Sequence, residues 1–306
     1  MVLLMGVRTG RRIQMPDGVA LRADVHSPRR SLGRAPLVLV HGTLVSRRDY
    51  RAFAPLLARA WGGEVIVYDR RGRSDVLPQL PEHSLASEAA DLLHVVSAVG
   101  AGGVLGHSYG GTVTLYAAGQ APDAWPWVTY DAALNPGGVL QEKWKPEFRE
   151  LIDAGALDDG WALLVQGLGT AGAVSRLPLP LLRVAGHALS SATPVGRRMY
   201  AALPGSLREM ESILQQTAPF PLPRRGLMLN GGLSPDYFHD ASAAVTLSRP
   251  GIEHLSLPGL LHNGVMLPLT SLARLVVRGL LRHPADLSFP TPTPAGPRPA
   301  EQEPEQ

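Results

Sequence analysis

The chain has 306 residues, of which 45% are hydrophobic and 18% charged, and it contains 33 glycines, 28 prolines and no cysteine. Glycine and proline together fall short of the roughly 25–30% that is typical of low-complexity chains, so disorder throughout the chain is excluded. The absence of cysteine excludes disulfides, thiolate metal ligands and a thiol nucleophile. Any nucleophile must therefore be an oxygen or an amine.

The formal net charge of +3 is small for this length, although the isoelectric point is about 9.4. Most basic residues are arginines scattered in twos and threes beside acids or turns, such as Arg11-Arg12 and Arg70-Arg71. They form no basic helical stripe and no known reader motif, so we expect no nucleic-acid partner. No apolar run approaches the roughly 18 residues of a membrane span, and residues 1–5 are too short for a signal peptide. We therefore expect a cytoplasmic protein without a membrane span.

Short apolar stretches alternate with longer helical patterns in the first half, which is typical of a parallel sheet with crossover helices. Residues 12–15 and 19–25 are separated by Pro16-Asp17-Gly18, a turn sequence that predicts an antiparallel hairpin. The following pattern predicts strands at 36–40, 64–68, 103–105 and 127–130, with helices at 48–61, 85–99 and 109–118.

The segment 132–224 breaks this alternation, because it contains helical patterns and no convincing strand. We interpret it as a helical cap inserted into an α/β core that comprises residues 1–131 and 225–282. The chain beyond 282 is proline-rich with little to bury, so we expect residues 283–306 to be a disordered tail. The cap pattern predicts helices at 144–154, 158–167, 181–191 and 195–216, and the resumed core predicts strands at 226–229 and 252–257 with helices at 237–245 and 265–281.

The stretch Gly106-His107-Ser108-Tyr109-Gly110 matches the pattern G-x-S-x-G. It follows a predicted strand and precedes a predicted helix, which is the setting of a nucleophile elbow. The flanking glycines give the strained turn room, and Gly111 adds clearance against the neighbouring strand. We predict that Ser108 presents a nucleophilic hydroxyl at the carboxyl edge of the sheet. The alternative is a glycine-rich loop without this role.

A serine hydroxyl needs a base that takes its proton. His262 follows the last predicted strand and precedes the last predicted helix, so we predict that it is this base. The developing oxyanion needs two backbone N–H groups, which we assign to Tyr109, directly after the nucleophile, and to Thr43, after the turn His41-Gly42. We interpret the following histidines as surface or core residues: His26, His83, His94, His187, His239, His254 and His283.

Four motifs, in this order and spacing, resemble those of the α/β-hydrolase superfamily: His41-Gly42, residues 69–74, residues 106–111 and residues 257–262. The resemblance covers about residues 12–281. It implies the α/β-hydrolase fold, with a mostly parallel sheet, flanking helices and an inserted helical cap. Within the second motif, we expect Asp69 and Arg71 to tie loops together beside the site.

The acid of the predicted triad departs from the common superfamily pattern. The acid usually lies in a Gly-x-x-Asp turn after the cap, but the matching turn here is Gly231-Gly232-Leu233-Ser234. Some members carry the acid at the end of the strand before the cap, where this chain has Asp131. We therefore predict Asp131 as the acid and keep Asp236 as the alternative. A capping role for the following loop is the non-catalytic interpretation of Asp131.

The resemblance implies a serine hydrolase that acts on a carboxylic ester, lactone or thioester through an acyl-enzyme on Ser108. No metal or organic cofactor is implied, and no particular oligomeric state is predicted. The cap is rich in apolar residues such as Trp144, Trp161 and Met199, which favours a small hydrophobic acyl or ester substrate. Two alternatives stay open: the same fold and triad used for carbon–carbon bond cleavage or a biosynthetic cyclisation, and a ligand-binding protein that has lost catalysis.

Overall fold

A single sheet forms the centre of the computed structural model, which describes residues 6–73, 83–121, 124–138, 143–215 and 221–282. Within these residues the sheet has eight strands in the order β1-β2-β4-β3-β5-β6-β7-β8. β1 pairs antiparallel with β2, and β2 pairs antiparallel with β4, whereas all other neighbours are parallel. The strands are β1 (Val7–Gln14), β2 (Ala20–His26), β3 (Arg34–Val40), β4 (Gly63–Tyr68), β5 (Gly103–His107), β6 (Trp127–Tyr130), β7 (Gly226–Gly231) and β8 (Ile252–Leu257).

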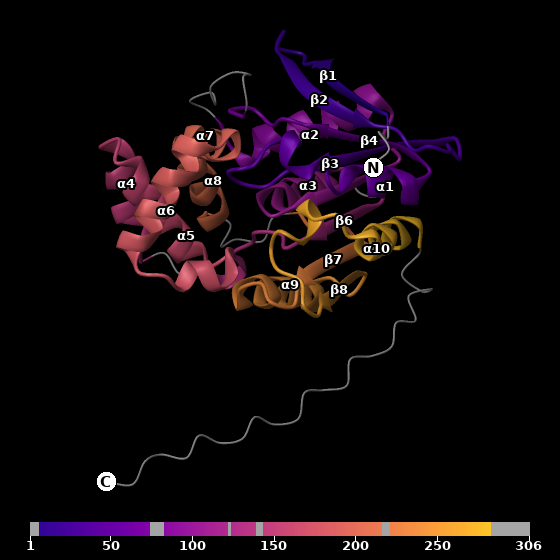
Figure 1. Cartoon of the computed structure of the whole chain (residues 1–306). Helices are drawn as coiled ribbons and strands as arrows, with labels where there is room; N and C mark the ends of the chain where they lie inside the picture. Colours follow the sequence, from indigo (N-terminus) through magenta and orange to yellow (C-terminus); the bar gives the residue numbers. More distant parts are fainter. Residues whose placement is uncertain (1–5, 74–82, 122–123, 139–142, 216–220, 283–306) are drawn as a thin grey trace.

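Helices cover both faces of the sheet (Figure 1). Because successive side chains of a strand point to opposite faces, the central strand β3 contributes to two separate cores. Leu37 and Leu39 pack with α1 and α10, whereas Val38 and Val40 pack with α2, α3 and α9. The continuous apolar run of this strand is thus explained by burial on both faces. These helices are α1 (Ala54–Trp61), α2 (Leu85–Val99), α3 (Tyr109–Gln120), α9 (Asp236–Ser248) and α10 (Thr270–Leu281).

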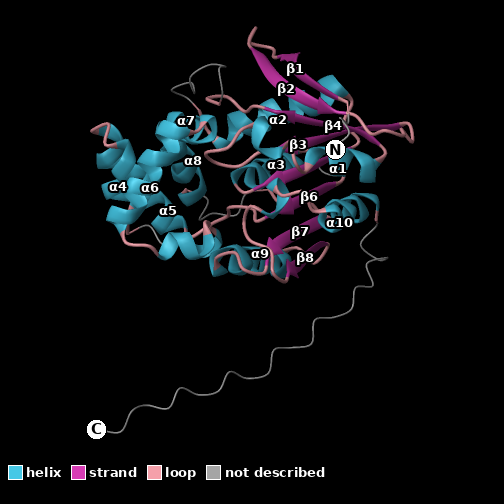
Figure 2. Cartoon of the chain, in the orientation of Figure 1, coloured by secondary structure: helices cyan, strands magenta, loops and turns pink. Residues whose placement is uncertain are grey.

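Between β6 and β7 the described chain forms helices and no strand, and these helices gather to one side of the sheet (Figure 2). We call residues 145–214 the helical insertion. Its apolar side chains form a third buried cluster, which also contains Leu44 from the loop after β3. The insertion therefore packs against a loop at the carboxyl edge of the sheet. Its helices are α4 (Lys145–Asp153), α5 (Leu157–Leu168), η3 (Gly172–Arg176), α6 (Leu179–Ala192), α7 (Pro194–Ala201) and α8 (Leu203–Leu214).

The predicted mostly parallel sheet with flanking helices is confirmed, and the hairpin at its start is present with a longer first strand. The division into a core of residues 1–131 and 225–282 and a cap of residues 132–224 stays a prediction. The tail predicted at 283–306 lies outside the described residues. No helix in the described part of the chain is both long and apolar enough to cross a bilayer.

Three helices predicted from periodicity are wrong in their bounds, and proline is the physical reason in each case. Proline lacks an N–H group and fits the first turn of a helix but not its interior. The helix predicted at 48–61 is therefore a 3₁₀ turn, η1 (Arg47–Tyr50), followed by α1 with Pro55 in its first turn. The helix predicted at 195–216 divides into α7 and α8, with Pro204 in the first turn of α8. The last helix begins at Thr270, after Pro268, and is preceded by the separate 3₁₀ turn η4 (Gly264–Met266).

Candidate active site

Ser108 occupies the sharp turn between β5 and α3, where its backbone has φ 54° and ψ −125°. A non-glycine residue in such a conformation carries strain of about 1–3 kcal/mol and persists only where the surroundings impose it. The neighbouring glycines are part of those surroundings. A Cβ atom on Gly106 would lie 2.4 Å from Thr114 Oγ1, one on Gly110 would lie 2.3 Å from the Val40 oxygen, and one on Gly111 would lie 2.9 Å from Ala132 Cβ. The predicted strand–turn–helix setting is thus present, and each glycine is sterically required.

His262 lies in the loop between β8 and η4, with its Nδ1 atom 3.0 Å from Oδ2 of Asp131. Asp131 directly follows β6, is fully buried and has a left-handed backbone with φ 47°. The ring of His262 also stacks on Phe238 at a centroid distance of 4.8 Å. With Nδ1 bonded to the carboxylate, Nε2 is the nitrogen left to accept a proton. Ser108, Asp131 and His262 thus follow β5, β6 and β8 at one edge of the sheet, and Ser108 and His262 line the same cavity.

Asp131 receives hydrogen bonds at both carboxylate oxygens. Oδ1 accepts from Asn230 Nδ2 and from the Gly231 N–H, each at 3.0 Å, and Oδ2 accepts from Ser234 Oγ at 2.6 Å as well as from His262. Burial alone raises the pKa of this carboxyl, but His262 and these further donors outweigh burial, so that the pKa of Asp131 lies below its usual value. Asp131 is therefore an ionised carboxylate at neutral pH.

The alternative acid, Asp236, is the first residue of α9 and has an exposed side chain. It lines the same cavity as His262, whereas the carboxylate in hydrogen-bond contact with the imidazole is that of Asp131. Ser234 stands where the superfamily pattern places the acid, and it donates to Asp131. The structure thus brings Asp131 to His262 and leaves Asp236 at the cavity wall.

Thr43 and Tyr109 are the predicted oxyanion donors. Tyr109 is the first residue of α3, so its N–H is one of the four that have no acceptor within a helix. Thr43 lines the cavity together with Ser108. The loop that carries Thr43 approaches the nucleophile closely, because a Cβ atom on Gly42 would lie 2.7 Å from Ser108 Cβ.

The cavity at Ser108 has a volume of about 780 Å³, which is within the range of small-molecule sites. The helical insertion supplies much of its wall, and most of the lining side chains are apolar. Lys145, Asp236 and Asp240 are its charged members. The apolar lining includes Leu44, Val45, Trp144, Trp161, Leu164, Val165, Leu168, Met199, Met210, Ile213, Leu214, Phe238, Leu261 and Met266.

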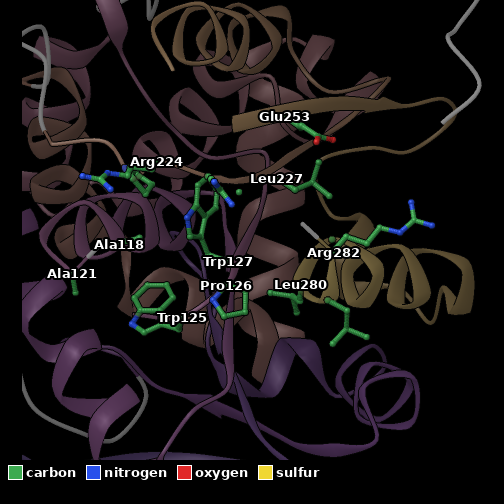
Figure 3. Close-up of a pocket in the computed structure, with 15 residues that line it drawn as sticks. Ala118, Ala121, Trp125, Pro126, Trp127, Arg224, Leu227, Glu253, Leu280 and Arg282 are labelled. Carbon is green, nitrogen blue, oxygen red and sulfur yellow. The ribbon is translucent and has the colours of Figure 1, made fainter. Parts of the chain in front are cut away.

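A second cavity, of about 340 Å³, lies at the opposite edge of the sheet (Figure 3). Trp127 and Leu227, at the amino ends of β6 and β7, form part of its wall together with Arg224, Glu253 and Arg282. Because Ser108 follows the carboxyl end of β5, this cavity is separate from the candidate active site. Among the described residues, no group of three or more histidine, aspartate or glutamate side chains is placed to hold a metal ion.

The turn at residues 69–73 carries a buried ion network that the sequence only partly predicted. The expected loop-tying roles are confirmed, since Asp69 binds Arg47, and Arg71 binds Asp17 and Asp91. Arg70 was missed, although it is fully buried, binds Glu88 and Glu209, and lies 4.9 Å over the ring of Tyr109. Glu209 belongs to α8, and no sequence pattern pairs it with an arginine 139 residues earlier.

Two further residues at the site, His107 and Tyr50, were also missed. The hydroxyl of Tyr50 lies 2.6 Å from His107 Nδ1, and His107 Nε2 lies 2.9 Å from the carbonyl oxygen of His262. The sequence offered one signal for His107, which is its position directly before the nucleophile. The last residue of a strand lies at the same edge of the sheet as the elbow that follows it.

The comparisons with known proteins agree with this architecture. The sequence profile of a family described as the α/β-hydrolase fold matches residues 35–161. No curated protein sequence matches the chain significantly. Among solved structures, an α/β hydrolase from Sphaerobacter thermophilus has 20% sequence identity and a TM-score of 0.65, over 88% of this chain and 99% of that one.

Two other solved structures have a similar sequence identity and TM-score to this chain. A bromoperoxidase from Bacillus anthracis has 16% identity and a TM-score of 0.62, over 88% of this chain and 99% of its own. An esterase from Exiguobacterium antarcticum has 17% identity and a TM-score of 0.58, over 81% of this chain and 90% of its own. The family match over residues 35–161 and these structural similarities show that the chain has the α/β-hydrolase fold, as its motifs predicted.

Proposed function

We propose that the protein is a serine hydrolase that cleaves a carboxylic ester, lactone or thioester with an apolar acyl group. The observation that carries the proposal is the 3.0 Å contact between His262 Nδ1 and the buried carboxylate of Asp131, at the cavity that Ser108 also lines. An ionised acid, a base whose other nitrogen is free for the nucleophile, and a strained serine are the parts that acyl transfer requires.

In the proposed reaction, Ser108 Oγ attacks the acyl carbonyl carbon while His262 Nε2 takes its proton. The N–H groups of Thr43 and Tyr109 stabilise the oxyanion, and Asp131 stabilises the imidazolium. The C–O or C–S bond to the leaving group then breaks, and His262 returns the proton to that group. Water, activated by His262, attacks the acyl-enzyme and releases the carboxylic acid together with free Ser108.

The proposed substrate class follows from the cavity. Its wall combines the aromatic and aliphatic side chains of the helical insertion with the loops around Ser108, so an apolar acyl or alcohol group is buried there on binding. In this proposal the cap of residues 132–224 selects the substrate, and the esterase among the similar structures is consistent with it. A protein that has lost catalysis is expected to lack an acid beside His262. Ser234 stands at the usual position of the acid, but the contact between Asp131 and His262 supports Asp131 in that role.

A panel of p-nitrophenyl esters of increasing acyl length tests the proposal. We expect turnover by the wild-type protein, with kcat/KM rising from acetate to medium-length chains as more apolar surface is buried. Ser108→Ala lowers kcat by about 10⁴-fold or more. Ser97→Ala, an exposed position in α2, is the matched control and retains wild-type turnover. Equal turnover by wild type and Ser108→Ala would contradict the proposal.

A further inference from the structure

His107, the residue directly before the nucleophile, is 2% exposed and has a hydrogen-bond contact at each ring nitrogen. Nδ1 lies 2.6 Å from the hydroxyl oxygen of Tyr50, and Nε2 lies 2.9 Å from the main-chain oxygen of His262. The hydroxyl oxygen of Tyr50 in turn lies 3.2 Å from the Gly42 nitrogen. Four residues, from two loops, η1 and the end of β5, are therefore joined in one hydrogen-bonded chain.

Only one placement of the protons on Tyr50 and His107 satisfies every bond of this hydrogen-bonded chain. Burial, and secondly the neighbouring His262, lower the pKa of His107 to about 3, so its ring is neutral at physiological pH. A carbonyl oxygen only accepts, so Nε2–H of His107 donates to His262, and Nδ1 is the acceptor. Tyr50 must then donate its O–H to Nδ1, and its oxygen accepts the Gly42 N–H. In this arrangement the Gly42 N–H, the Tyr50 O–H and the His107 Nε2–H each donate to one acceptor.

The hydrogen-bonded chain ends at two loops, the loop of Gly42 and the loop of His262, and both loops must be aligned with Ser108. Gly42 directly precedes Thr43, the proposed oxyanion donor, and a Cβ atom on Gly42 would lie 2.7 Å from Ser108 Cβ. His262 carries the proposed base at the other end. Tyr50 is fully buried and His107 nearly so, and low exposure of this kind strengthens the bonds between them.

A second side chain holds the base loop one residue earlier. The hydroxyl of Tyr130 donates to the carbonyl oxygen of Leu261 at 2.7 Å. Two successive carbonyls of the loop, those of residues 261 and 262, are therefore bound by side chains at the ends of the neighbouring strands β6 and β5. Only the bond from His107 also reaches the oxyanion loop.

We propose that His107 is a positioning residue which, through Tyr50, fixes the oxyanion loop and the main chain of His262 in register with Ser108. This inference rests on the proposed serine-hydrolase function. In the assembled site, His107 does not act on the substrate itself. It sets the distance between the oxyanion loop, which it reaches through Tyr50, and the loop that carries His262.

Substitutions at His107 test the inference, with the second-order rate at which a fluorophosphonate modifies Ser108 as the first readout. We expect His107→Leu, which removes both contacts, to lower this rate and kcat for a p-nitrophenyl ester by about 100-fold, with KM changed by less than about threefold. His107→Gln places an N–H near the position of Nε2 and keeps both rates within about tenfold of wild type. A residue that matters for folding alone gives no such division between kcat and KM.

The matched control is His26→Gln, the same substitution at a histidine that is 1% exposed and lies at the end of β2, on the far edge of the sheet. It retains the wild-type rates. If His107→Leu does not fold, as judged by its thermal unfolding, Tyr50→Phe carries the test, because it removes one hydroxyl from the chain and slows Ser108 modification by about tenfold.

Wild-type modification rates in a folded His107→Leu or in Tyr50→Phe would overturn the inference. A His107→Gln variant as slow as His107→Leu would overturn it as well. A wild-type protein that the fluorophosphonate does not modify would overturn the proposed function instead, so the two failures are distinguishable.

Discussion

Ser234 Oγ donates a 2.6 Å hydrogen bond to Oδ2 of Asp131, the same oxygen that lies 3.0 Å from His262 Nδ1. Asp131 follows β6 and Ser234 follows β7, and these strands are parallel neighbours with Tyr130 opposite Leu229. The carboxyl ends of adjacent parallel strands meet at one edge, so a carboxylate on either strand reaches the same imidazole. The candidate acid follows the strand before the helical insertion. Ser234, which follows the strand after the insertion, donates a hydrogen bond to it.

Replacing each carboxylate by an amide distinguishes between the two candidate acids, Asp131 and Asp236. We expect Asp131→Asn to lower kcat by about 10³–10⁴-fold, because the amide neither holds the required tautomer of His262 nor stabilises its charged form. Asp236→Asn leaves kcat within about tenfold of wild type, since its exposed carboxylate makes no contact with the imidazole among the described bonds. Steady-state kinetics with one ester substrate decide the matter, and a larger loss in Asp236→Asn would reverse the assignment.

A carboxylate at position 234 is expected to act differently in two backgrounds. In the wild type, Ser234→Asp places a second buried acid against Asp131, and like charges at this distance destabilise the fold and lower activity. In Asp131→Asn, the same substitution supplies a carboxylate one strand away and restores at least about tenfold of the lost kcat. The paired measurement is kcat in the single and double variants. A double variant no more active than Asp131→Asn would contradict the geometric equivalence of the two positions.

The buried ions between the helical insertion and the sheet provide a stability test. Glu209 is fully buried and binds Arg70 at 2.9 Å as well as Arg73. We expect Glu209→Gln to lower the free energy of unfolding by about 3–5 kcal/mol, because two buried guanidinium groups lose a compensating charge. Glu211 lies in the same helix as Glu209 and forms an exposed ion pair with Arg149 of α4, so Glu211→Gln removes that pair and changes stability by less than about 1 kcal/mol.

Urea unfolding of both variants measures this difference. Equal effects at positions 209 and 211 would show that the buried network contributes no more than a surface pair. A further consequence concerns the site, because Arg70 lies over the Tyr109 ring. Loss of Glu209 is therefore also expected to slow Ser108 modification.

The sequence predicted the fold because it depends on local patterns, and the same patterns singled out Ser108, Asp131 and His262, which the structure places at one edge of the sheet. Alternating apolar runs and helical periodicity identified each of the strands that the structure describes, and Gly106, Gly110 and the strand before Ser108 identified the elbow. Helix bounds failed at Pro55 and Pro204, where a proline in the first turn of a helix was treated as interior, and at Pro268, which lies two residues before the last helix. Those errors are correctable from sequence, since proline has a fixed preference for that turn.

The remaining features depend on contacts between distant segments. The link from Tyr50 through His107 to His262 joins residues 57 and 155 positions apart, and Arg70 finds Glu209 across 139 positions. Hydrogen-bond partners at such separations are set by the packed fold and leave no periodic pattern in one sequence. Asp131 was predictable as the candidate acid beside His262, but its three further hydrogen-bond partners, Asn230, Gly231 and Ser234, were not.

The low pKa of His107 gives a prediction on acid stability. Between the ordinary pKa of 6.5 and the folded-state pKa of about 3, the unfolded chain binds a proton at this position that the folded protein does not. Stability is therefore lost as the pH falls through this window, by about 1.4 kcal/mol per pH unit from this group. His107→Gln removes that contribution, so its free energy of unfolding falls less steeply than that of the wild type between pH 6 and pH 4.

Urea unfolding at several pH values measures the two slopes. His26→Gln serves as a reference, because burial lowers the pKa of His26 to about 4 and its removal is expected to flatten the dependence in the same direction. Identical slopes in the wild type and His107→Gln would contradict a neutral His107, and with it the direction of the hydrogen-bonded chain.

The most direct test of the central claim is the site at which a fluorophosphonate attaches to the protein. Peptide mapping by mass spectrometry locates the adduct after brief exposure of the wild type, Ser108→Ala and Asp131→Asn. We predict a single adduct on Ser108 in the wild type, none in Ser108→Ala, and slow formation of the same adduct in Asp131→Asn. An adduct on another residue, or no adduct on the folded wild-type protein, would contradict the account.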